Sequence, residues 1–338
     1  MSEVIIKDYG ISLRYKKGLM LVYKKGEVLK RIPLTNVRRI IVLTSGVSIS
    51  SKLVRALVRS SIDLYFLNSR GEPIARLDPP YHTKTVYTRR MQYEAYNDKR
   101  GVEIAKALAY SKVRNQAGML RYLARNRDDI SLKEELREVA MLIDRKAEEI
   151  ALIKEEKVDL IRNDIINLEA EAARLYWPAI ANILPEELGF SGRNQEGEDV
   201  FNKMLNYGYG VLKGTIWSVL LLVGLDPYAG YLHIDRSGRP SLILDFMEQF
   251  RQPVVDRALV ALVAKEGTNL VSKLERDGRL NNELRANIVV EISKRLKSKV
   301  KRHDRKITLE MMIKRQARSL ARYLRGEESK FMGYIERW

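Results

Sequence analysis

The first quarter of the chain alternates apolar and polar residues with a period of two, which is the pattern of half-buried strands. Lys16-Lys17-Gly18 and Lys24-Lys25-Gly26 interrupt this pattern, and such polar-glycine pairs are hairpin turn signals. Ser50 precedes a short stretch of helical period and is expected to cap it. The expected strands are residues 12–15, 19–23, 28–32, 37–43, 62–67 and 73–77.

From residue 101 onward the period changes to three or four, which is typical of helices that pack on one side. Ser131 and Glu134 have the spacing of a capping box, so a helix is expected to begin there. Asp199 is expected to cap a helix that runs to Gly224. Three glycines weaken that helix and indicate the close approach of a neighbouring helix: Gly208, Gly210 and Gly214.

This change of period predicts the organisation of the chain. We expect an α+β fold in which a small β-rich N-terminal domain (residues 1–80) is followed by a larger all-α C-terminal domain (residues 101–338) that carries catalysis. Residues 81–100 form a polar, tyrosine-rich linker. In the linker, Arg89 and Tyr93 have the chemistry to contact a DNA backbone and to stack on a base. The alternative is a linker that is docked on its own protein.

The chain is strongly basic, with 61 Lys and Arg against 43 Asp and Glu and a formal net charge of +18. Such an excess attracts polyanions. Thirteen basic residues and only two acidic ones lie between Lys294 and Arg325. Helical spacing places Lys297, Lys301 and Arg305 on one ridge, where we expect them to bind DNA phosphates. The alternative is an ordinary solvated helix face.

Composition also excludes several classes of site. The chain has no Cys, which excludes disulfides, thiolate metal sites and cysteine nucleophiles. With only three histidines (His82, His233 and His303), a multi-histidine metal site is excluded. The start of the chain lacks the pattern of a signal peptide, and the longest apolar stretch is too short to span a membrane. We therefore expect a cytoplasmic protein without membrane contact.

One carboxylate lies where carboxylates are rare. Glu169 is in register with Ile165 and Ala172 on the apolar face of an expected helix, whereas Glu171 is on the other side. A buried carboxylate is normally ion-paired or bound to a metal. Position alone favours neither a buried salt bridge nor a metal ligand.

A histidine and two carboxylates lie close together further along the chain. His233 precedes a turn, and Asp245 and Glu248 follow it one helical turn apart, so both project to the same side. Considered alone, His233 is expected to be a structural residue, and Glu248 is expected to form a surface ion pair with Arg251. Jointly, an imidazole and carboxylates suit Mg²⁺ or Mn²⁺ with positions open for phosphate oxygens. In so basic a chain, this favours phosphodiester chemistry on nucleic acid.

The chain resembles a known family in four segments: residues 165–177, 206–210, 224–233 and 240–251. These segments are similar to the CRISPR-associated adaptation endonuclease, the first-numbered Cas protein, which is the integrase subunit of spacer acquisition. The resemblance covers nearly the whole chain. It implies that the catalytic residues and metal ligands are Glu169, His233 and Glu248, with Asp245 behind them. Many relatives have Gly where this chain has Ala170, and some have Asp where it has Glu248.

The resemblance implies an Mg²⁺- or Mn²⁺-dependent DNA endonuclease and integrase. In such an enzyme, a 3′-hydroxyl of the incoming spacer DNA attacks a phosphodiester of the CRISPR repeat, or water nicks the DNA. It also implies a homodimer that binds DNA and the small second-numbered Cas protein. Two alternatives stay open from the residues: a non-catalytic basic DNA-binding scaffold, and a general structure-selective DNA nuclease.

Overall fold

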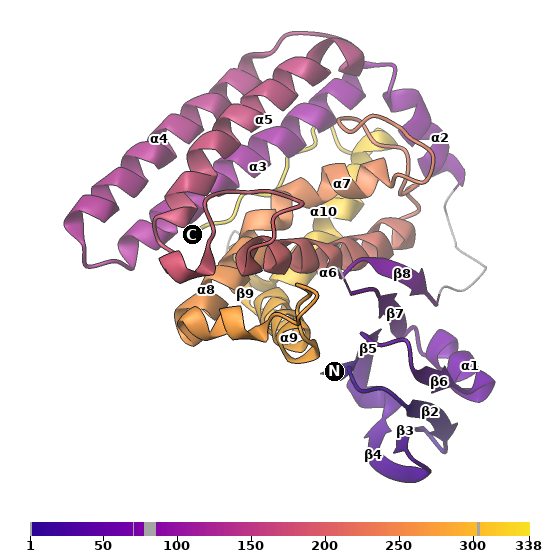
Figure 1. The fold of residues 1–338 in the computed structure, drawn as a ribbon. Coiled ribbons are helices and arrows are strands. Elements are labelled where there is room, and N and C mark those ends of the chain that lie inside the picture. Colours follow the sequence, from indigo (N-terminus) through magenta and orange to yellow (C-terminus); the bar gives the residue numbers. More distant parts are fainter. Residues whose placement is uncertain (1, 70, 78–85, 303–304) are drawn as a thin grey trace.

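The structure is a computed structural model that describes residues 2–69, 71–77, 86–302 and 305–338. Figure 1 shows a β-rich N-terminal part beside a larger, mostly helical part. This arrangement confirms the α+β fold class expected from the change of hydrophobic period. His82 and His303 lie outside the described residues.

Two lysine-glycine turns organise the first sheet. Lys17, Gly18, Lys25 and Gly26 have φ values of 47°, 78°, 51° and 87°, the left-handed geometry of tight hairpins that match the twist of their strands. The turns join three antiparallel strands, and a fourth strand pairs in parallel with β2, giving the order β4-β3-β2-β6. The strands are β2 (Ile11–Lys16), β3 (Leu19–Lys24), β4 (Glu27–Pro33) and β6 (Val47–Ile49).

The second sheet is buried on both faces. Its order is β1-β5-β7-β8, with only β8 antiparallel. Along β7, Leu64 faces the core of the N-terminal part, whereas Tyr65 and Leu67 face the core of the helical part. The sequence predicted all these strands except β1. The elements are β1 (Ser2–Ile6), η1 (Leu34–Asn36), β5 (Val37–Val42), α1 (Ser51–Arg59), β7 (Asp63–Leu67) and β8 (Pro73–Arg76).

The helical part is built on three long helices that lie side by side (Figure 1). These are α3 (Lys99–Arg125), α4 (Ile130–Leu152) and α5 (Val158–Ala181). The remaining helices are α2 (Val86–Ala95), η2 (Glu186–Leu188), α6 (Val200–Leu222), α7 (Ser241–Met247), η3 (Glu248–Phe250), η4 (Arg251–Asp256), α8 (Arg257–Glu266), η5 (Gly267–Lys273), α9 (Asn282–Lys297) and α10 (Leu309–Leu324). Within the described ranges, no helix is both long enough and apolar enough to cross a membrane.

One helix start differs from the prediction. The helix α4 begins at Ile130, and its cap is Asp129, whose side chain accepts a hydrogen bond from Leu132 N at 3.1 Å. The expected capping box at Ser131 and Glu134 is therefore wrong, because the aspartate satisfies the free amides first. The cap of α6 is Asp199, as predicted, and it accepts a hydrogen bond from Asn202 N at 2.8 Å.

The basic ridge of the sequence is not a single helix. The helix α9 ends at Lys297, and a hairpin follows, formed by β9 (Lys299–Arg302) and β10 (Arg305–Thr308). The helical ridge expected for Lys297, Lys301 and Arg305 is therefore wrong. The hairpin forms because apolar Val300 alternates with lysines and pairs with Ile307, which buries Val300. All three basic residues remain exposed.

The two parts of the chain meet closely at one pair of glycines. A Cβ atom on Gly210 of α6 would overlap the carbonyl group of Gly71, in the turn between β7 and β8. Gly208 packs against Val255 in the same intimate way, whereas Gly214 has ordinary space around it. Two of the three glycines thus allow a close approach, and the neighbour of Gly210 is a turn instead of the expected helix.

The last residues of the chain pack along α3. The side chain of Asn115 donates to Tyr334 O at 2.8 Å and to Gln249 O at 2.9 Å, and it accepts from Glu336 N at 2.9 Å. Gln249 accepts from Tyr334 N at 2.7 Å. Trp338 lies where a side chain on Gly118 would be. These bonds fix α3 to the η3 turn.

We expect Gly210→Ala to destabilise the protein and Gly214→Ala to leave it unchanged or stabilise it. The new methyl group at position 210 would displace the β7–β8 turn, at a cost of about 1–3 kcal/mol in the free energy of unfolding. At position 214 the nearest atom is Tyr65 Cδ1 at 3.8 Å, so alanine gains helix propensity of about 1 kcal/mol or less. Urea denaturation followed by circular dichroism measures both. An equal response of the two variants would contradict the close contact.

Candidate active site

The loop that carries His233 is held by the helix α2. Gln92 donates to the carbonyl oxygens of Asp226 (2.9 Å) and Ala229 (2.8 Å), and it accepts from Asp226 N at 2.8 Å. The hydroxyl of Tyr93 donates to the Asp226 carboxylate at 2.6 Å. The segment expected to be a linker therefore contains a helix that braces the loop. Tyr93 is docked through its hydroxyl group, and its ring remains half exposed.

Asp245 organises the end of the same loop. Its carboxylate, fully buried on α7, accepts backbone hydrogen bonds from Tyr231 N (2.6 Å), Leu232 N (3.0 Å) and His233 N (2.9 Å). One of its oxygens also lies 2.5 Å from His233 Nδ1. With Nδ1 protonated toward the carboxylate, the lone pair of the imidazole lies on Nε2, which is the arrangement of metal-binding histidines.

Two carboxylates from separate elements converge on one lysine. Glu169 of α5 and Glu248 of η3 are both buried. Lys112 of α3 places its Nζ 3.2 Å from Glu169 Oε1 and 3.0 Å from Glu248 Oε2. Arg251 pairs with the other oxygen of Glu248 at 2.8 Å. Asp245 does not join this cluster, although it lies one turn before Glu248.

A change of helical pitch presents Glu248 and Arg251. The α-helix α7 tightens into the 3₁₀ turn η3 and then widens into the π-helical turn η4, a combination that is common at functional sites. Asp256, at the end of η4, accepts hydrogen bonds from the hydroxyl groups of Tyr176 (2.9 Å) and Tyr209 (2.7 Å). The guanidinium of Arg251 lies 4.7 Å over the Tyr209 ring. These contacts fix the irregular segment to α5 and α6.

Burial and the neighbouring charges shift the pKa values of the two carboxyl groups of the cluster. Burial raises the pKa of Glu169 against the charge of Lys112, and the charge of Glu248 adds to the rise. Burial acts in the same direction on Glu248, but Arg251 and then Lys112 outweigh it and lower the pKa of this carboxyl group. A positive charge on His233 would also lower the pKa of both carboxyl groups.

The donor atoms fit a hard divalent cation. Glu169 Oε1 and Glu248 Oε2 are buried and accept no hydrogen bond of good geometry from any described residue. Among the described residues, no three Asp, Glu or His side chains lie close enough together to hold a metal ion in this arrangement, in which Lys112 separates the carboxylates. Two carboxylates and His233 Nε2 are nonetheless the ligand set that suits Mg²⁺ or Mn²⁺.

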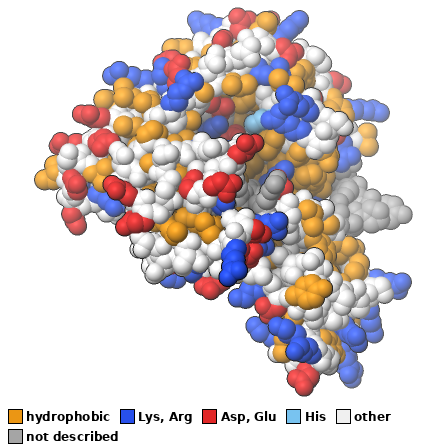
Figure 2. Space-filling view, viewed as in Figure 1, with side chains coloured by type: hydrophobic (Ala, Val, Ile, Leu, Met, Phe, Trp, Pro, Cys, Tyr) orange, Lys and Arg blue, Asp and Glu red, His pale blue; other side chains and the backbone are white. Residues whose placement is uncertain are grey.

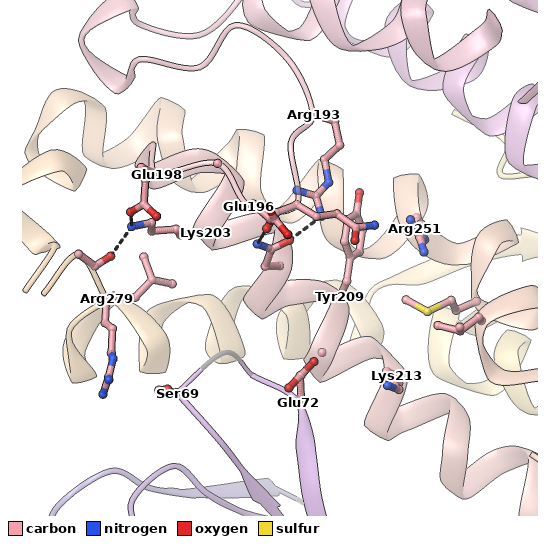
Figure 3. Close-up of a pocket in the computed structure, with 18 of the residues that line it drawn as sticks. Ser69, Glu72, Arg193, Glu196, Glu198, Lys203, Tyr209, Lys213, Arg251 and Arg279 are labelled. Carbon is pink, nitrogen blue, oxygen red and sulfur yellow. Dashed lines mark hydrogen bonds and ion pairs between the residues drawn. The ribbon is translucent and has the colours of Figure 1, made fainter. Parts of the chain in front are cut away.

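A cavity of about 760 Å³ adjoins the cluster (Figure 3). Arg251 lies at its edge, and Tyr209 and Arg193 line it beside the ion network. The turn at Ser69 and Glu72 closes it from the N-terminal part. Figure 2 shows basic and acidic side chains along the hollow between the two parts. The cavity therefore offers cations that suit a phosphate group, whereas the Tyr209 ring is already covered by Arg251 and Arg193.

The basic residues that were expected to bind DNA lie apart from this cavity. Arg89 is partly buried on α2, close to the braced loop. Lys297 lies at the end of α9, and Lys301 and Arg305 lie on the β9–β10 hairpin. None of these residues lines the cavity, so a DNA path that includes them runs outside it.

Sequence reasoning missed Lys112. The signal that marks it is its register, since it follows Ala105 by seven residues and therefore lies within about 20° of the same buried face of the helix. A lysine on a buried face needs a partner. Arg251 was expected to pair with Glu248 at the surface. It does pair with Glu248, but the carboxylate is buried and the arginine is mostly covered.

The chain matches known proteins over nearly its whole length. The sequence model of the family described as "CRISPR associated protein Cas1" matches residues 4–294. A protein named CRISPR-associated endonuclease Cas1 1 from Pyrobaculum aerophilum is 46% identical over 261 residues, covering 77% of this chain and 82% of that protein. The protein of the same name from Archaeoglobus fulgidus is 34% identical over 353 residues, covering 99% and 100%.

A solved structure shares the fold. A structure described as a casposase bound to integration product has a TM-score of 0.82 and 24% identity, covering 98% of this chain and 93% of that chain. At this identity the likeness concerns the fold alone. The matches in sequence confirm the family resemblance found in the four segments around Glu169, Tyr209, His233 and Glu248. The chain therefore belongs to the CRISPR-associated Cas1 family.

Proposed function

We propose that this protein is an Mg²⁺- or Mn²⁺-dependent DNA endonuclease and integrase that inserts spacer DNA into a CRISPR array. The observation that carries the proposal is the convergence of Glu169 and Glu248, buried on separate elements, on Lys112. His233 joins them as the third ligand that the family resemblance implies. It is supported by the names of the curated relatives, which are endonucleases, and by the casposase of the same fold, which is described as bound to an integration product. The proposal includes the cytoplasmic location expected from the sequence.

The residues around the cluster have separate tasks in this proposal. Glu169, Glu248 and His233 Nε2 would hold the ion, and a bound Mg²⁺ or Mn²⁺ would supply charge neutralisation at the scissile phosphate and orientation of the attacking oxygen. Asp245 fixes the imidazole through Nδ1, which leaves Nε2 as the ring nitrogen available to a metal. Arg251 holds Glu248 and presents its remaining donors to the cavity, where a phosphate would lie. The protein's own cations thus bind and orient the DNA strand.

We also propose the partners that the family resemblance implies: DNA, a second copy of the chain, and the small second-numbered Cas protein. The organisation into residues 1–80, 81–100 and 101–338 is part of the same proposal. The edge strands of the β-rich part include β4 and β8, and the helical part holds the ion cluster. A division of labour between assembly and chemistry follows from this arrangement.

We expect Glu169→Ala, His233→Ala and Glu248→Ala each to reduce strand transfer about 100-fold or more, because each removes a metal ligand. The assay joins a labelled duplex with 3′-hydroxyl ends to a plasmid that carries a repeat, with Mg²⁺, Mn²⁺ or EDTA. Glu171→Ala is the matched control on the same helix, since Glu171 lies outside the cluster and pairs with Lys146. It should leave activity unchanged.

The same assay separates the alternatives. Full activity in all three alanine variants would remove the assignment of the site. DNA binding without any metal-dependent product, with the second-numbered Cas partner present, would favour a non-catalytic scaffold. Cleavage of branched DNA without preference for the repeat would favour a structure-selective nuclease.

We expect Asp245→Asn to weaken Mn²⁺ binding about 10- to 100-fold while the chain stays folded. The asparagine NH₂ group would face either the backbone N–H groups of Tyr231 and Leu232 or the Nδ1–H of His233, and each arrangement turns the imidazole away. Titration calorimetry measures the affinity, and Asp235→Asn, in the exposed part of the same loop, is the control. Unchanged affinity in Asp245→Asn would show that His233 is positioned by other contacts.

We expect the double variant Lys301→Ala with Arg305→Ala to bind DNA more weakly and with a flatter dependence on salt. The slope of log affinity against log salt should fall by about one for each lost phosphate contact. The double variant Arg137→Ala with Arg145→Ala, at exposed positions of the outer helix α4, is the matched charge control. If both variants changed the slope equally, the β9–β10 hairpin would have no special role, and only net charge would matter.

A further inference from the structure

Lys112 occupies the position between the two carboxylates that a divalent ion would need. Its Nζ lies 3.2 Å from Glu169 Oε1 and 3.0 Å from Glu248 Oε2. Within the described part of the chain, no hydrogen bond of good geometry reaches these two oxygens. The ammonium group therefore balances their charge. A metal ion that enters between the carboxylates would be repelled by this ammonium and would have to displace it.

The need for a cation at this point follows from burial. Two neighbouring carboxylates that leave water lose their hydration and repel each other, so both stay ionised only with positive charge between them. Lys112 meets this need from within the chain. Its side chain is 17% exposed, and its flexible four-carbon stem can change rotamer while α3 stays folded.

Arg251, the other cation of the cluster, does not have this freedom. Its guanidinium binds the far oxygen of Glu248 at 2.8 Å and lies 4.7 Å over the Tyr209 ring. Both contacts hold it to one side of the carboxylate pair. The compact, flexible ammonium of Lys112 thus lies between the two carboxylates. The planar guanidinium of Arg251 is fixed on the far side of Glu248.

We infer that Lys112 is an internal counter-cation that holds Glu169 and Glu248 together while no metal is bound and withdraws when the ion enters. This inference rests on the proposed metal site. It implies that the site is formed before the ion arrives, at the expense of affinity. Only the fraction of molecules in which Lys112 has withdrawn can bind the ion, and the apparent affinity falls by that fraction.

The test compares Mn²⁺ binding by the wild-type chain, Lys112→Met and Lys99→Met. Methionine keeps the length and the apolar stem of lysine without its charge. Lys99 lies at the start of the same helix with 72% of its side chain exposed, and it serves as the control. We expect Lys112→Met to bind Mn²⁺ roughly tenfold more tightly than wild type in titration calorimetry, and Lys99→Met to match wild type.

The same variants are then melted in EDTA and in Mn²⁺. Lys112→Met should melt at a lower temperature than wild type in EDTA, because its carboxylates lack their counter-charge. The rise in melting temperature on adding Mn²⁺ should be larger for Lys112→Met than for wild type. Equal or weaker Mn²⁺ binding by Lys112→Met, with wild type binding, overturns the inference and leaves the metal site intact. Absence of Mn²⁺ binding by wild type and Lys112→Met alike removes the proposed metal site itself.

A second measurement needs no substitution and stands even if Lys112→Met does not fold. Acetylation of lysines in the wild-type chain, quantified by mass spectrometry, reports whether an ammonium is held or free. We expect Mn²⁺ to raise the reactivity of Lys112 several-fold and to leave that of Lys99 unchanged. Reactivity of Lys112 that stays constant through saturation with Mn²⁺ would show that the ammonium does not move.

Discussion

The burial of two neighbouring carboxylates sets the terms for the rest of this structure. Glu169 and Glu248 come from separate elements and lose hydration together, and only positive charge within a few ångströms offsets that loss. Lys112 and Arg251 provide it. The helices α3 and α5 and the turn that bears Glu248 must therefore meet at one point. The long, mutually packed helices supply the rigidity that such a meeting requires.

The third arm of the site is a loop, and it is made rigid in a different way. Asp245 gathers three consecutive backbone amides, while Gln92 clamps the loop from the other side. A loop with so many of its polar groups bound inside the protein loses most of the freedom that loops usually have. The result is an imidazole held by the Asp245 carboxylate on a loop whose backbone is also bound to that carboxylate. Glu169 and Glu248, in contrast, are held by packed helices.

Local signals made much of this predictable, and non-local contacts account for the rest. Lysine-glycine turns determine the hairpins within a few residues, and Glu169 stands out because its helix is otherwise apolar on that face. The basic ridge misled because charges at helical spacing recur in any lysine-rich segment, whereas the alternation around Val300 decides the conformation. The register of Lys112 marks it as a buried lysine, but its partners Glu169 and Glu248 lie far away in the sequence and become known only from the fold.

The contacts of Asn115 carry a consequence for how the protein is made. Two of the backbone groups that satisfy its buried amide belong to residues 219 and 221 positions later in the chain. As α3 emerges during synthesis, the side that bears Asn115 therefore remains exposed to water, because its polar group still lacks the partners that burial requires. Docking of this side is a long-range event of the kind that limits folding rates. The wall behind the ion cluster is thus completed only after Tyr334 and Glu336 have been synthesised.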